Sequence, residues 1–191
     1  MIKFLYIFVK YKESVDLLQN TLFKNSSKLV IIWSKEGVEP IRIFPYISKC
    51  LEGELVMYGN SDISIGEGFE KIDPKIIKEK KLMYALTRYS TYDTYGICDP
   101  KKWVGNSDTF LFFAKNFTLA DFEIMAANKW NEPGRENLLI YMFEKKLGYK
   151  VMNPCKVLKT YHEHRVNLRN RQPARVNLKY SGKAEITDQL Y

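Results

Sequence analysis

The sequence has few cysteines and no long hydrophobic run, which argues against a disulfide-rich protein and against a membrane-spanning one. Only three of its 191 residues are cysteines, and Cys50, Cys98 and Cys155 lie far apart. This odd number fits neither a disulfide framework nor a CxxC zinc site, so a reducing compartment is the simplest interpretation. The longest early apolar run, residues 4–9, is bounded by lysines, lacks a signal-peptide pattern and is far too short to cross a bilayer. We therefore expect a cytoplasmic protein without a transmembrane segment.

Lys and Arg are plentiful, and most of the net positive charge lies near the C-terminus. The chain has a formal net charge of +8. Residues 156–183 contain eight Lys or Arg and one acid, which is a local charge of +7. Such a segment attracts phosphate-bearing partners such as a nucleoside diphosphate, a nucleic acid or an anionic membrane. A merely solvated basic tail is the plainer alternative.

Apolar runs of strand length alternate with helix-length segments along most of the chain. We expect strands over residues 1–9, 28–33, 54–58, 82–86, 109–114 and 149–153. Helices are expected over residues 12–23, 40–51, 73–80, 118–128 and 135–147, the second interrupted or kinked at Pro45. This order predicts an α/β fold with a mostly parallel central sheet and helices on both faces. One domain, residues 1–168, and a basic C-terminal tail, residues 169–191, complete the prediction.

The polar triplet Asn60-Ser61-Asp62 follows the third predicted strand directly. In a parallel α/β sheet, ligands bind at the carboxyl ends of the strands. A carboxylate there can hold a hard divalent ion, which in turn binds two phosphates. Asp62 is the candidate direct ligand, and Asn60 would orient ribose, sugar or water. The sequence GNSD also occurs at residues 105–108, and a turn aspartate is the structural alternative for Asp62.

Six short elements in a fixed order carry a family resemblance. They are residues 56–63 (VMYGNSDI), 85–89 (ALTRY), 107–112 (SDTFLF), 133–137 (PGREN), 148–154 (GYKVMNP) and 160–164 (TYHEH). This series resembles a group of GT-A-type glycosyltransferase domains found in bacteria and in large DNA viruses of algae, over roughly residues 54–165. The chain departs from the group in having Asn60 in place of the first Asp of a DxD motif, Phe110 where Trp is frequent, and Glu136 where Asp is usual.

The resemblance implies a GT-A-like fold and a metal-dependent activity. A sugar would pass from a nucleotide-diphosphate sugar to a glycan, a glycoprotein or another hydroxyl acceptor, with Mn²⁺ or Mg²⁺ as the cofactor. The viral members of the group suggest hexose or deoxy-sugar transfer, and a viral protein would act in the host cytoplasm.

The predicted donor and metal residues lie in three parts of the chain. His162 and His164 are its only histidines, and an extended segment would point both the same way. The resemblance favours one of them as a late metal ligand beside Asp62; two surface histidines are the alternative. Donor contacts are expected from Asn60, Ser61, Asp62, Arg88 and Arg165, although Arg88 would serve equally in a surface salt bridge.

Two acids are candidates for catalysis or acceptor binding. An inverting transferase needs a carboxylate that removes the proton of the acceptor hydroxyl. Asp108 begins a predicted strand at a loop edge, and Glu136 begins a predicted helix. A turn residue is the alternative for Asp108, and a favourable charge at the helix N-terminus is the alternative for Glu136.

Two other functions compete with glycosyl transfer. The basic C-terminal segment would suit a nucleic-acid-binding module, but no RRM, KH or zinc signature is present. A nucleotidyltransferase would share the α/β sheet and the metal, but would ordinarily have a Gly- and Lys-rich first loop. We expect no nucleic-acid partner.

Overall fold

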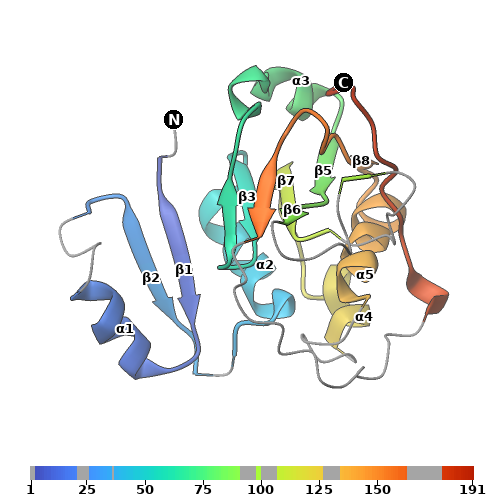
Figure 1. Cartoon of the computed structure of the whole chain (residues 1–191). Helices are drawn as coiled ribbons and strands as arrows, with labels where there is room; N and C mark the ends of the chain where they lie inside the picture. The colour runs from blue at the N-terminus through green and yellow to red at the C-terminus, as the bar shows by residue number, and fades with distance from the viewer. Residues whose placement is uncertain are drawn as a thin grey trace, which may run out of the picture.

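The computed structural model describes residues 3–20, 26–35, 37–90, 98–99, 107–126, 134–162 and 178–191. These residues form an α/β structure with three separate sheets, two of them mixed, and with helices packed on the central sheet (Figure 1). No helix among them is long and apolar enough to cross a membrane.

The central sheet has four strands in the order β3-β7-β5-β8. Its strands are β3 (Leu55–Gly59), β5 (Leu82–Leu86), β7 (Thr109–Phe113) and β8 (Lys150–Met152). β7 is antiparallel to both of its neighbours, whereas β5 and β8 are parallel. The sheet is therefore mixed, and a mostly parallel central sheet is not what the structure shows. The connection that leaves β5 returns to the same edge, where Asp108 N–H donates to Leu86 O at 3.1 Å, and this return makes β7 antiparallel.

The first two strands form a sheet of their own. β1 (Leu5–Val9) and β2 (Leu29–Trp33) pair in parallel, with α1 (Lys12–Gln19) as the crossover. Figure 1 shows this unit beside the central sheet. A third sheet has the order β4-β9-β6 and consists of β4 (Ile63–Ile65), β9 (Thr160–His162) and β6 (Tyr89–Ser90). β9 is antiparallel to β4 and parallel to β6.

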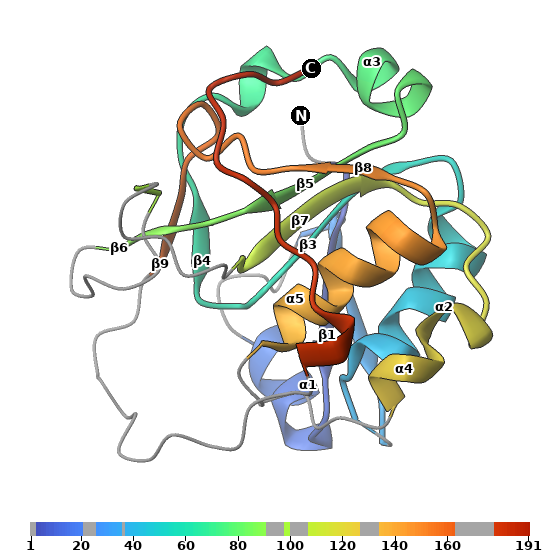
Figure 2. The ribbon, with the colours of Figure 1, turned by 90° about the vertical axis from the view of Figure 1, so that its right-hand side faces the viewer.

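Helices cover both faces of the central sheet, as predicted (Figure 2). One face carries α2 (Pro40–Leu51), η2 (Ala120–Phe122), α4 (Glu123–Ala126), α5 (Arg135–Tyr141) and the π-helical η3 (Met142–Lys146). The other carries α3 (Pro74–Glu79), with η1 (Phe69–Lys71) just before it in the chain. α2 continues through Pro45, so the helix is not interrupted there, and a kink at Pro45 stays a prediction. The Asp73 side chain accepts from Lys75 N–H at 2.9 Å and caps the N-terminus of α3.

The alternation of side chains along β5 explains why the sheet has a core on each face. Met83 and Ala85 belong to the larger core, and Leu82, Tyr84 and Leu86 belong to the smaller one. All five residues are fully buried, so this strand is covered on both sides.

An aromatic cluster fills the larger core around Phe44 of α2. The ring of Tyr58, on β3, lies 5.4 Å from the Phe44 ring. Four phenylalanine rings also lie within 6 Å of it, the nearest at 4.6 Å; they are Phe112, Phe117, Phe122 and Phe143. These ring contacts join α2 to the central sheet and to the helices on the same face.

The C-terminal residues 178–191 pack along the domain. After η4 (Leu178–Tyr180), Gly182 N–H donates to Asn137 O at 2.8 Å, and Ala184 is fully buried. A side chain on Gly182 would collide with the backbone of Tyr141 and the side chain of Ile140. Farther on, Ile186 forms a parallel bridge with Asn153. This stretch therefore lies directly against α5 and the end of β8.

Candidate functional site

One edge of the central sheet gathers chain ends from all four strands. β3, β5 and β8 end there, and β7 begins there because it runs the other way. Gly59 and Leu86, the last residues of β3 and β5, both pair with Thr109, the first residue of β7. Ligands of open α/β sheets bind outside the carboxyl ends of the strands. We call this region the strand-end edge.

Asp108 is the centre of one polar group at the strand-end edge. Its Oδ1 accepts from Asn60 Nδ2 at 3.3 Å, and its Oδ2 forms an ion pair with Arg88. The Arg88 side chain is 3% exposed and that of Asp108 is 14% exposed, so this pair is almost fully buried. A buried guanidinium and carboxylate each need the other, because an unpaired charge in this position would be costly. A surface salt bridge was the alternative expected for Arg88, but its salt bridge with Asp108 is buried.

Asp62 and His162 form a second group beside the first. Asp62 directly precedes β4, and Ile63 of β4 pairs with His162 at the end of β9. This register brings His162 Nε2 to 3.0 Å from Asp62 Oδ2, although the two residues are 100 positions apart. The side chain of His162 is 12% exposed and that of Asp62 is 36% exposed. A carboxylate and an imidazole therefore meet at a site that solvent reaches.

The Asp62–His162 contact is a hydrogen bond, and the two atoms would become ligands of a divalent ion that replaced the shared proton. Adjacent ligands of an octahedral ion with bonds of about 2.1 Å are about 3 Å apart, close to the separation of these two atoms. Mg²⁺ and similar ions keep several waters and are commonly completed by substrate phosphates. Among the described residues, no cluster of three or more His, Cys, Asp or Glu side chains could hold a metal. Other ligands would have to come from water, from a diphosphate or from outside the described ranges.

The remaining predicted residues fall in different places. Ser61 is exposed in the turn between β3 and β4, next to Asp62. Glu136 is half-buried in the first turn of α5, an element separate from those that carry the two polar groups described above. His164 and Arg165 lie outside the described residues. The proposed roles of these residues stay predictions.

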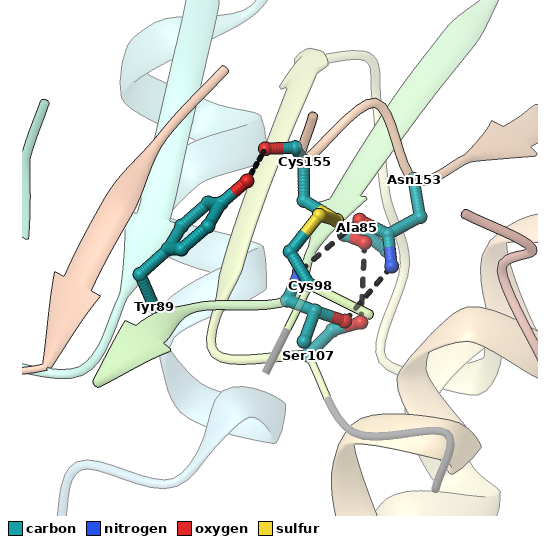
Figure 3. The surroundings of a disulfide bond; sticks show 7 residues. Ala85, Tyr89, Cys98, Ser107, Asn153 and Cys155 are labelled. Atoms are coloured by element: carbon teal, nitrogen blue, oxygen red, sulfur yellow. Dashed lines mark hydrogen bonds between the residues drawn. A yellow bond between two sulfur atoms is a disulfide. The ribbon is translucent and has the colours of Figure 1, made fainter. Parts of the chain in front are cut away.

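The structure contains a disulfide bond that the sequence prediction lacked. Cys98 is bonded to Cys155, with their Cα atoms 5.8 Å apart (Figure 3), and Cys50 is free and exposed. The prediction failed because the spacing of cysteines does not show which chain segments meet. Cys155 follows β8, residue 98 follows β5, and these two strands are parallel neighbours that end at the same edge. The cysteine count therefore gives no support to a reducing compartment.

Aromatic and charged side chains line the third sheet next to these groups. The Tyr161 hydroxyl donates to Glu67 Oε2 at 3.0 Å, and the rings of Tyr161 and Tyr89 lie 5.9 Å apart. Hydrogen bonds from its own backbone and from Tyr161 lower the pKa of Glu67. Because side chains alternate along a strand, Tyr161 points to the face of this sheet opposite His162. The tyrosine pair thus flanks the candidate metal site without facing it.

Asn153 is a buried residue of this edge to which sequence reasoning assigned no role. It is fully buried after β8, and its side chain bonds twice to Thr87. The only signal in the sequence was its place in the element GYKVMNP. Such a motif marks the position without indicating what the amide does.

Comparison with known proteins finds no protein-family model, no curated protein and no solved structure that matches the chain. The interpretation of the site therefore depends on its own geometry and chemistry.

Proposed function

We propose that this protein is a metal-dependent glycosyltransferase that moves a sugar from a nucleotide-diphosphate sugar to a glycan or another hydroxyl acceptor. The observation that carries the proposal is the meeting of Asp62 and His162 at the strand-end edge, 3.0 Å apart. Both were expected as metal ligands from the sequence. Residues from five of the six elements that resemble GT-A-type domains lie at or beside this edge, which supports a GT-A-like assignment.

Asp62 and His162 would hold Mn²⁺ or Mg²⁺ against the diphosphate of the donor. The bound ion supplies Lewis-acid stabilisation of the charge that develops on the departing nucleoside diphosphate. Asn60 and Ser61 directly precede Asp62 and would contact the donor. To bind the ion, the coordinating ring nitrogen of His162 must carry no proton, because only an unprotonated nitrogen has a lone pair to donate.

Asp108 is the candidate group for the acceptor hydroxyl. Each carboxylate oxygen can accept more than one hydrogen bond, so the contacts with Asn60 and Arg88 leave capacity for a further donor. An acceptor hydroxyl bound there would donate to Asp108 and be oriented by it. Arg88 keeps this carboxylate in a fixed position.

Thermal melting with a nucleoside diphosphate and Mn²⁺ tests the proposal. A ligand at one hundred times its Kd stabilises by about 2.7 kcal/mol. For a domain of this size that corresponds to a rise in Tm of roughly 5–10 °C. Asp62→Ala should abolish the rise, whereas Asp16→Ala, an exposed acid on α1, should not. A screen of nucleotide sugars for Mn²⁺-dependent hydrolysis would identify the donor.

Three outcomes would contradict the proposal in different ways. Equal stabilisation by the nucleotide in the presence of a chelator would remove the metal from the mechanism. Stabilisation by polynucleotides with a steep dependence on salt would favour a nucleic-acid-binding module. No response to any nucleotide or nucleotide sugar, with or without metal, would refute the function itself.

A further inference from the structure

Asn153 links two parts of the structure that are far apart in sequence. Its Oδ1 accepts from Thr87 N–H at 3.1 Å, and its Nδ2 donates to Thr87 Oγ1 at 2.8 Å. Both residues are fully buried. The Asn153 side chain thus gives the backbone N–H of Thr87, the residue after β5, the hydrogen-bond acceptor that a neighbouring strand would otherwise supply.

The backbone of Asn153 is itself held by the C-terminal segment. Its N–H donates to Glu185 O at 3.3 Å, and its carbonyl accepts from Thr187 N–H at 3.0 Å. The same segment is tied down farther along, where the Tyr84 hydroxyl donates to Leu190 O and the Tyr191 hydroxyl donates to Lys71 O at 3.1 Å. Figure 3 shows Asn153 beside Cys155 and near Ala85 and Ser107.

Thr87 is followed directly by Arg88, whose guanidinium pairs with Asp108. β5 ends at Leu86 and β6 begins at Tyr89, so Thr87 and Arg88 form the two-residue junction between strands of different sheets. Asp108 is fixed from the other side, where its N–H donates to Leu86 O and Ser107 Oγ donates to Ala85 O at 3.1 Å. The two bonds from Asn153 are thus one of the restraints on the direction in which Arg88 leaves β5, beside the pairing of Tyr89 with β9.

We propose that Asn153 is a positioning residue for the strand-end edge: it holds Thr87 and thereby aims Arg88 at Asp108, and the C-terminal segment holds Asn153. This inference rests on the proposed function for its catalytic consequence. The alternative is that Asn153 only satisfies buried polar groups, as any buried amide must. The positioning role and the purely structural role differ in whether removal of the Asn153 side chain weakens the ion pair between Arg88 and Asp108.

A double-mutant cycle separates the two without any knowledge of the substrate. Urea midpoints are measured for Asn153→Ala, Arg88→Ala and the double variant. Positioning predicts that the double variant loses less than the sum of the single losses, because the second change removes a pair already misaligned. The matched control is Ser48→Ala, because Ser48 Oγ accepts from the buried Phe117 N–H at 2.7 Å and belongs to α2. Its loss should add to that of Arg88→Ala. Additive losses for Asn153 as well would overturn the proposal.

The kinetic consequence is tested with the donor that the hydrolysis screen identifies. Asn153→Ala should lower kcat at least tenfold with little change in the donor KM, whereas Ser48→Ala should stay within twofold of the original protein. Should Asn153→Ala fail to fold, Thr87→Val decides, since it keeps the side-chain volume but removes the acceptor for Asn153 Nδ2. It should lower kcat in the same direction, and an unchanged kcat would overturn the proposal. Equal turnover in Asn153→Ala and Ser48→Ala would refute positioning. If the original protein is inactive, the proposed function is refuted, and the double-mutant cycle in urea alone tests the positioning role of Asn153.

Discussion

The disulfide between Cys98 and Cys155 leads to the most sharply defined prediction about stability. The two cysteines are separated by 57 residues, and Cys155 is fully buried. Cross-linking a loop of this length removes chain entropy from the unfolded state worth about 4 kcal/mol. For a domain of about 190 residues, each kcal/mol shifts Tm by about 2–4 °C, so reduction should lower Tm by roughly 8–16 °C.

The perturbation is Cys98→Ser, compared with the original protein in the absence and presence of a reductant. Calorimetry should show a lower Tm for the variant, and the reductant should lower only the Tm of the original protein. Cys50→Ser is the matched control, because Cys50 is exposed and free and should leave Tm unchanged. Mass spectrometry of the alkylated protein would count the free thiols. Three free thiols in the non-reduced protein, or equal melting of Cys98→Ser and the original, would refute the reasoning. Alkylation at lysis would also show whether the bond exists in the cell.

Two further predictions concern buried groups. Asp108→Ala should destabilise the protein by about 3–5 kcal/mol in urea unfolding, because Arg88 stays buried without the Asp108 carboxylate. The control is Glu54→Ala, which breaks an exposed ion pair with Lys3 and should cost less than about 1 kcal/mol. Equal losses of stability in the two variants would contradict the argument. Burial raises the pKa of Tyr149 to about 12, so the folded state keeps the phenol neutral while the unfolded state ionises near pH 10. The free energy of unfolding should therefore fall as pH rises from about 10 to 12. Thermal melts recorded across this pH range should show a flatter fall for Tyr149→Phe. An unchanged slope in this variant would contradict the prediction.

The secondary structure was largely predictable, whereas the arrangement of the strands was not. The run at 109–113 has the composition of a strand buried on both faces, and β7 is such a strand. That composition is the same for a parallel and an antiparallel strand in this position. The orientation of β7 depends on where its connection from β5 returns, which no local pattern records. The separate pairing of β1 with β2 was hidden for the same reason.

The candidate site was predictable where a motif carried the signal. Asp62 was found from its position after β3, and His162 came from the resemblance and the scarcity of histidine. Their contact depends on the register of β4 with β9, two three-residue strands too short to show a period. Asn153 and the disulfide were missed because both act through contacts between distant segments.

The reversed direction of β7 has a consequence for how the protein could diversify. The connection between β5 and β7 leaves and returns at adjacent points, Leu86 and Asp108, which are hydrogen-bonded to each other. A loop closed in this way can double in length for only about 0.6 kcal/mol of additional closure entropy. Insertions that keep Arg88, β6 and Cys98 in place would leave the strand pairing, the Arg88–Asp108 ion pair and the disulfide intact. A chain that kept these residues could vary the rest of the connection without changing the central sheet.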